Sequence, residues 1–222
     1  MVNTHPGDPS AGRLIEGAKV LGLALGAAQI DALIRYAWLL GAWGKVFNLS
    51  AVRDAEAVVS HHLLDSLAVV PALDRWRQGR RLQLLDVGSG AGLPGVPLAI
   101  ARPDWLITTV DAVAKKAAFV RQVTGELGLV NLRALHGRVG DPTTGPGTGF
   151  DVVISRAFSS LEALVNSTRA QLSPGGVWLA MKGKIPLIEI EALPNDVDVF
   201  HVEQLAVPGL EAARCLVWIR PH

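Results

Sequence analysis

The spacing of apolar positions changes about a third of the way along the chain. From about Leu14 to Gly41 apolar residues recur at helical spacing, and no alternating strand pattern occurs there. A second helical stretch is predicted from about Asp54 to Leu73, ending near Pro71 and Asp74. We therefore expect residues 1–79 to form a helical extension that packs on the rest of the chain.

Beyond this region, in residues 80–222, short β-rich runs alternate with helical segments. Strands that alternate with helices indicate parallel βαβ units and a doubly wound α/β sheet, which is a Rossmann-like fold. The expected strands are 81–87, 106–112, 130–137, 150–157 and 175–183, and the expected helices are 91–102, 114–128 and 160–172.

The end of the chain, residues 198–220, contains two β-like runs with no helix between them. Such a pair predicts an antiparallel hairpin at the edge of the sheet. Rossmann-like methyltransferases carry a hairpin in this place, whereas dinucleotide dehydrogenases usually continue with parallel strands. The C-terminal pattern therefore favours the methyltransferase class.

The segment DVGSGAG follows the first buried strand and opens a helix. Its glycines, Gly88, Gly90 and Gly92, let the chain turn sharply and let a ligand lie against bare backbone. The overlapping GAGLPG also matches the dinucleotide pattern G-x-G-x-x-G. However, the carboxylate of Asp86 suits the ammonium group of a methionine moiety and would repel a pyrophosphate. This favours S-adenosylmethionine, and Asp111 at the end of the next strand suits the ribose of either ligand.

Composition and charge limit the alternatives without selecting a substrate. The net charge of +1 gives no overall basic field, so it leaves RNA binding undecided. The single cysteine, Cys215, cannot form an internal disulfide, and the start lacks the pattern of a secretory signal. The adjacent His61 and His62 do not make a metal site. We expect a cytoplasmic protein that does not enter the membrane and binds no metal.

Four segments carry a resemblance to a known family: LLDVGSGAGLPGVPLAIARPD, VDAVAKKAAFVRQVTGELGL, FDVVISRAFSSL and LSPGGVWLAMKG. Together with the upstream NLSAVRDAEAVVSHHLLDSL, they resemble the RsmG (GidB) family over roughly residues 30–220. That family consists of bacterial methyltransferases of 16S ribosomal RNA. The resemblance implies that S-adenosylmethionine methylates N7 of one guanine in the decoding-region loop, with 16S ribosomal RNA or the small ribosomal subunit as partner. We expect the protein to be a monomer.

The resemblance also implies cofactor contacts at individual positions. Gly140 stands where the family commonly has a glutamate, so only a backbone contact is implied there. The implied contacts are Gly88, Leu93, Asp111, Val139, Gly140 and Arg156, which join Asp86, Gly90 and Gly92 of the glycine segment.

The expected chemistry requires positioning groups. Guanine N7 already presents a lone pair, so attack on the methyl group needs no general base, and alignment supplies the rate acceleration. Arg156 and Lys182 follow two strands at the ligand-binding edge, and we assign them to substrate positioning. The upstream segment adds Asn48, Arg53 and His62 as RNA-contacting candidates, with Lys182 also facing RNA.

Three alternative hypotheses about the function stay open at this point. A methyltransferase acting on a small molecule or a protein would keep the same glycine segment. An NAD-dependent oxidoreductase could use GAGLPG, although the only tyrosine, Tyr36, lies far upstream in the helical region. A non-catalytic module that binds a nucleoside is the third, for which Gly140 is the one hint.

Overall fold

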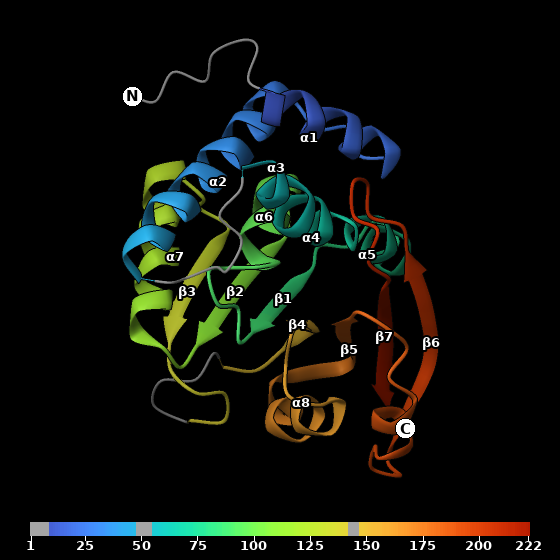
Figure 1. Ribbon diagram of the computed structural model, residues 1–222. Helices are drawn as coiled ribbons and strands as arrows, with labels where there is room; N and C mark the ends of the chain where they lie inside the picture. Colours follow the sequence, from blue (N-terminus) through green and yellow to red (C-terminus); the bar gives the residue numbers. More distant parts are fainter. Residues whose placement is uncertain (1–8, 48–54, 142–146) are drawn as a thin grey trace.

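The computed structural model describes residues 9–47, 55–141 and 147–222, and within them seven strands form a single sheet. The strands are β1 (Gln83–Val87), β2 (Leu106–Asp111), β3 (Leu132–His136), β4 (Phe150–Arg156), β5 (Leu172–Lys182), β6 (Val197–Leu205) and β7 (Arg214–Pro221). Their order is β3-β2-β1-β4-β5-β7-β6 (Figure 1). β1 to β5 pair in parallel, while β7 is antiparallel to both β5 and β6. The expected Rossmann-like α/β fold with an antiparallel C-terminal hairpin is confirmed.

Helices connect the strands and cover the sheet. They are α1 (Pro9–Val20), α2 (Ala27–Phe47), α3 (Ala55–Val58), the π-helix η1 (Val59–Leu64), α4 (Asp65–Leu67), α5 (Val70–Arg77), α6 (Gly95–Ala101), α7 (Ala114–Leu127), α8 (Leu161–Thr168), the 3-10 turn η2 (Arg169–Gln171) and α9 (Leu187–Glu191). The sequence patterns did not predict α9. None of the helices in the described ranges is both long and apolar enough to cross a bilayer.

The helical stretch expected from about Leu14 to Gly41 is interrupted between α1 and α2. Gly22 has φ +73°, and the N–H of Leu23 donates to the carbonyl of Ala18 at 2.8 Å, so α1 ends in a left-handed glycine cap. The chain then enters α2, where the Gln29 side chain accepts the N–H of Gly26 at 2.9 Å. The expected single stretch is therefore two helices.

The expected end of the second helical stretch, near Pro71 and Asp74, is wrong. Pro71 lies in the first turn of α5, where a missing N–H costs nothing because that position has no acceptor within the helix. The helix continues to Arg77 and stops at Gln78, which has φ +50°. Pro71 thus lies in the first turn of this helix and not at its end.

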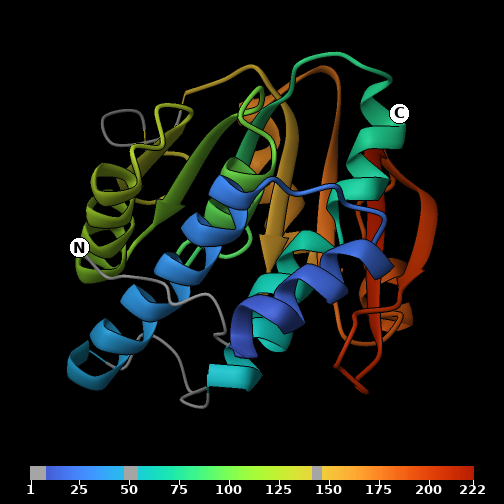
Figure 2. The ribbon, with the colours of Figure 1, turned by 90° about the horizontal axis from the view of Figure 1, so that it is seen from above.

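The two faces of the sheet bury different clusters of side chains. Neighbouring strand residues point to opposite faces. Leu84 accordingly joins a core that includes residues of α1, α2, α5, α6 and α7, and Leu85 joins a second core with residues of α8. Figure 1 shows α8 below the sheet, α2 and α6 above it and α7 at its left beside β3. Figure 2 shows α1 and α2 lying across the upper face. One continuous apolar cluster thus joins the N-terminal helices to the sheet.

The C-terminal hairpin places its second strand inside the sheet. β7 lies between β5 and β6, with Trp218 opposite Leu179 of β5, so β6 forms the edge. The pairing of β6 with β7 shifts register between Val199 and His201. The sequence predicts the hairpin, and the structure shows that β7 is the strand with a neighbouring strand on each side.

Close packing of α6 on the sheet depends on Gly95. A Cβ atom there would lie 2.6 Å from Cγ2 of Thr109 and 2.8 Å from Oδ2 of Asp86. Both neighbours are buried, at 1% and 0% exposure. The start of α6 can therefore approach β1 and β2 only without a side chain at this position.

Replacing Gly95 with alanine should lower the free energy of unfolding by about 1–3 kcal/mol, because the added methyl group overpacks this contact. Urea unfolding monitored by circular dichroism measures the change. The control is Gly125→Ala in α7, where no atom lies within 4 Å of the added Cβ and the change should stabilise the helix by about 0.5–1 kcal/mol. A Gly95→Ala protein as stable as the natural one would show that α6 packs differently.

Candidate active site

The carboxyl ends of β1, β2 and β4 meet at one edge of the sheet because the three strands are parallel. The glycine loop, residues 88–92, leaves β1 at this edge and leads into α6. Asp111 ends β2 and Arg156 ends β4. The structure thus brings the predicted loop, the predicted ribose-binding acid and the predicted positioning arginine to the same edge.

Hydrogen bonds from several directions hold the glycine loop. The N–H of Gly90 donates to Oδ2 of Asp111 at 2.8 Å, and the Tyr36 hydroxyl donates to the carbonyl of Ala91 at 2.8 Å. Gly90 has φ +60°, a left-handed conformation that favours glycine, and no atom lies within 4 Å of where its Cβ would be. The loop is therefore fixed, with open space beside its bare backbone.

Asp86 lies beneath the loop and is fully buried. Its Oδ2 accepts the N–H of Gly95 at 2.8 Å, while its Oδ1 is buried without a hydrogen-bond partner among the described residues. Burial raises the pKa of Asp86 to about 7, although the Gly95 N–H and the charge of Arg156 oppose the shift. One oxygen of this carboxylate thus lacks the partner that a buried polar atom requires.

Asp111 is nearly as buried, at 7% exposure, but both of its oxygens have partners. Oδ2 accepts the N–H of Gly90 and Oδ1 accepts the N–H of Val113, each at 2.8 Å. A carboxylate oxygen can accept two hydrogen bonds, so each keeps one acceptor site. These bonds fix the direction in which Asp111 can receive a pair of hydroxyl groups.

Arg156 is held by an ionic cluster centred on Asp65, which is 2% exposed. Its Nη1 donates to Oδ2 of Asp65 at 3.1 Å and to the carbonyl of His61 at 3.2 Å. Nε of Arg214 donates to the other oxygen of Asp65 at 2.7 Å. One buried carboxylate thus joins α4 to the end of β4 and the start of β7.

His62 lies in the π-helix next to this cluster. It is 8% exposed, and its Nδ1 is 3.0 Å from the carbonyl of His61. Burial, followed by the charge of Arg156, lowers the pKa of His62 to about 4. The imidazole is therefore neutral at neutral pH and contributes no positive charge toward RNA.

Lys182, the other predicted positioning residue, forms an ion pair in the structure. Its Nζ lies 2.8 Å from Oε2 of Glu189 in α9, and its side chain is 14% exposed. The same Oε2 accepts the N–H of Leu161 at the start of α8, also at 2.8 Å. Lys182 therefore takes part in fixing α9 against α8, and a contact with RNA would have to share or replace this pairing.

The remaining predicted positions differ in how they are placed. Leu93 is 5% exposed and belongs to the core, while Val139 is half-buried against the second core. Gly140 has φ +86°, so a glutamate in that backbone conformation would be strained. Asn48 and Arg53 lie outside the described residues.

Sequence reasoning missed residues that reach this edge from distant segments. Tyr36 and Arg214 have no local pattern that links them to the glycine loop or to Asp65, which is 149 residues from Arg214. Ala157, directly after β4, has φ +62°, an uncommon conformation for alanine that no sequence pattern indicates. Phe158 follows it, with its ring 3.6 Å from where a Cβ of Gly88 would lie.

The inserted antiparallel β7, the glycine loop after β1 and the acid at the end of β2 define the class of S-adenosylmethionine-dependent methyltransferases. A solved structure of this class from Aquifex aeolicus superposes with a TM-score of 0.53 at 15% identity, covering 73% of this chain and 92% of that one.

Within this class the chain belongs to the GidB family, rRNA small subunit methyltransferase G, whose profile matches residues 29–217. It is 54% identical over 214 residues to ribosomal RNA small subunit methyltransferase G of Leptothrix cholodnii, covering 96% of this chain and 97% of the relative. It is 55% identical over 216 residues to the protein of that name from Acidovorax ebreus, covering 94% of each. The resemblance found in the sequence is confirmed.

Replacing Asp65 with asparagine should lower the free energy of unfolding by about 2–3 kcal/mol, because two half-buried guanidinium groups lose their counter-charge. Urea unfolding near pH 7 measures the change in the free energy of unfolding. Asp198→Asn is the matched control, since Asp198 pairs with Arg220 at the surface and its loss should cost less than about 1 kcal/mol. If both substitutions cost the same, the Asp65 cluster does not join the segments as described.

Replacing Asp86 with asparagine should change how stability depends on pH. The pKa of Asp86 is about 7 in the folded state against an ordinary value of 3.8. Between these values the folded state binds more protons than the unfolded state, so this group makes stability fall as pH rises, levelling off above about 7.

Asparagine does not titrate, so the stability of Asp86→Asn relative to the natural protein should increase across that pH window, by at most roughly 4 kcal/mol. His62, whose pKa is lowered from 6.5 to about 4, contributes with the opposite sign but is common to both proteins. Urea unfolding of both proteins at a series of pH values gives the difference. A difference that does not vary with pH would contradict the raised pKa.

Proposed function

We propose that this chain transfers the methyl group of S-adenosylmethionine to N7 of a guanine in the decoding-region loop of 16S ribosomal RNA. The observation that carries the proposal is the family match over residues 29–217, the part of the chain that also forms the carboxyl-edge site. We further propose that the enzyme acts as a monomer in the cytoplasm, away from membranes, with 16S ribosomal RNA or the small ribosomal subunit as its partner.

The residues at the carboxyl edge fit the cofactor. Gly88 and Gly90 leave bare backbone, and the space beside Gly90 would be filled by any side chain there. Oδ1 of Asp86, which has no hydrogen-bond partner in the part of the chain that the structure describes, is an acceptor that suits the ammonium group of the methionine moiety. Asp111 has acceptor sites for the ribose hydroxyls. The proposed cofactor site also includes Gly92, Leu93, Val139, Gly140 and Arg156.

S-adenosylmethionine supplies an electrophilic methyl group on a positively charged sulfur. The protein has to align guanine N7 with that group and exclude water, and no side chain has to remove a proton. Alignment of this kind can contribute roughly 7–11 kcal/mol in favourable cases.

Arg156 is the group best placed to orient the guanine. Its Nη1 is occupied by Asp65 and the carbonyl of His61, whereas Nε and Nη2 have no hydrogen-bond partner among the described residues. Guanidinium groups bind the O6 and N7 edge of guanine or phosphate oxygens with strong, charged hydrogen bonds. We assign Arg156 to substrate positioning and keep Lys182, His62, Asn48 and Arg53 as proposed RNA contacts.

The enzyme should methylate one position of 16S ribosomal RNA when it is mixed with labelled S-adenosylmethionine and small ribosomal subunits from cells lacking this gene. Chemical cleavage of the RNA maps the N7-methylguanine.

Asp111→Asn should weaken S-adenosylmethionine binding about tenfold or more, because a charged hydrogen bond contributes about 1.5–3 kcal/mol. Calorimetry measures the affinity.

Asp104→Asn provides the control, since Asp104 precedes β2 at the opposite edge of the sheet and pairs with Arg77. This substitution should leave cofactor affinity unchanged. The proposal fails if the labelled methyl group enters protein or a small molecule while the RNA stays unlabelled. Equal weakening by both substitutions would remove Asp111 from the cofactor site.

A further inference from the structure

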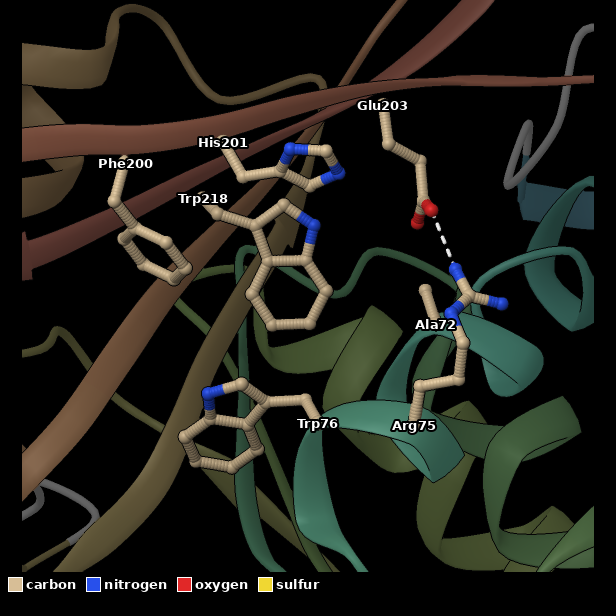
Figure 3. Close-up of a pocket in the computed structure, with 7 residues that line it drawn as sticks. All are labelled: Ala72, Arg75, Trp76, Phe200, His201, Glu203 and Trp218. Atoms are coloured by element: carbon tan, nitrogen blue, oxygen red, sulfur yellow. Dashed lines mark hydrogen bonds and ion pairs between the residues drawn. The ribbon is translucent and has the colours of Figure 1, made fainter.

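A pocket separate from the glycine loop lies between α5 and the C-terminal hairpin. Its volume is about 400 Å³, within the range of roughly 300–1,000 Å³ that is usual for sites that bind small molecules. Figure 3 shows its walls: Ala72, Arg75 and Trp76 from α5, Phe200, His201 and Glu203 from β6, and Trp218 from β7. The reaction proposed above makes no use of this pocket.

Trp76, Phe200 and Trp218 contribute aromatic rings to its walls. The ring of Trp218 is 3% exposed, with the ring of Trp76 at 6.3 Å and that of Phe200 at 6.1 Å between centroids. The two pairs are tilted by 38° and 57°, so the rings do not stack closely on one another. Phe200 is 36% exposed. The pocket thus offers aromatic faces at its floor and sides and can be reached from solvent.

Two polar atoms in the pocket lack partners among the described residues. Nε1 of Trp218 and Oε1 of Glu203 are buried and make no hydrogen bond there. Both lie on the side of the pocket where Arg75 pairs with Glu203 (Figure 3). A buried polar atom without a partner costs about 1–3 kcal/mol. A ligand with an adjacent acceptor and donor would satisfy both.

Arginine side chains flank the aromatic rings, and two of them, Arg75 and Arg220, also pair with Glu203 and Asp198. Arg80 lies 5.6 Å from the ring centroid of Trp76, and Arg220 lies 5.1 Å from that of Phe200. The side chain of Arg75 is 63% exposed at the mouth of the pocket. Positive groups interleaved with aromatic rings are typical of surfaces that bind single-stranded nucleic acid, because the rings stack on bases and the cations contact phosphates.

We propose that this pocket binds one unpaired nucleobase of the RNA substrate, at a nucleotide other than the methylated guanine. Proteins recognise RNA mainly through unpaired bases that stack on aromatic side chains and form hydrogen bonds through their edges. Trp218 Nε1 would donate to the base and Glu203 Oε1 would accept from it. This inference rests on the proposed RNA substrate.

The position of the pocket in the sheet makes it a second site. β7 lies three strands from β1 in the order β1-β4-β5-β7, which is roughly 14 Å at about 4.8 Å per strand. Trp218 belongs to the same core, and therefore the same face of the sheet, as α5 and α6. One base therefore cannot occupy both places, and the proposal requires an RNA long enough to contact both.

The test compares Trp76→Leu with Trp38→Leu, a matched control on α2 that removes a ring of 55% exposure outside the pocket. Trp76→Leu should weaken binding to transcribed 16S ribosomal RNA and to small subunits by about 5- to 150-fold, because stacking of one base contributes about 1–3 kcal/mol. It should raise KM for the RNA, leave kcat at saturating RNA within twofold, and leave S-adenosylmethionine affinity unchanged. Trp38→Leu should change none of these.

A second variant at the more exposed Phe200 tests the pocket with less risk of unfolding the protein. Phe200→Ala should reproduce the RNA effect, with thermal unfolding as a check that both variants fold. RNA affinities within twofold of the natural protein for both variants would overturn the inference. Weaker binding to the small subunit with unchanged binding to naked RNA would also overturn it, because the pocket would then contact a ribosomal protein. A natural protein that does not methylate the small subunit at all would instead overturn the proposed function.

Discussion

The buried carboxylate of Asp65 is the contact on which the arrangement of the site depends. It binds Arg156 at the end of β4 and Arg214 at the start of β7, two segments that the sheet itself separates by β5. Removing Asp65 would leave two half-buried guanidinium groups without their counter-charge. The helical segment that carries Asp65 is therefore fixed over the carboxyl edge of the sheet. His61 and His62, in the preceding π-helix, are fixed with it.

The glycine loop is held in the same manner by side chains from elements distant in sequence. Asp86 binds the start of α6, Asp111 binds Gly90 and Tyr36 binds Ala91. These bonds form during folding, so a ligand does not have to order the loop when it binds, and less of its binding energy is lost to ordering. Through Tyr36, helix α2 thus contributes to holding the loop of the proposed cofactor site.

Much of the fold could be predicted because strands and helices leave local patterns in the sequence. The run before Asp86 and the glycines after it identify β1 and its loop without knowledge of any neighbour. Pairings could not be predicted, because Arg156 meets Asp65 across 91 residues and Lys182 meets Glu189 of a helix too short to leave a pattern. Pro71 was misread because proline is compatible with both ends of a helical pattern. The boundary between residues 79 and 80 stays a prediction.

The ion pair of Arg156 with Asp65 does not compete with the substrate-positioning role that we propose for Arg156. An exposed arginine samples many rotamers, and ordering it when RNA binds would cost free energy. Here two acceptors fix Nη1, so the remaining N–H groups keep one direction before any substrate arrives. Burial also leaves His62 neutral, which lowers the density of positive charge beside Arg156. For a reaction that needs alignment and no proton transfer, a guanidinium held rigid by a buried carboxylate is better suited than a free one.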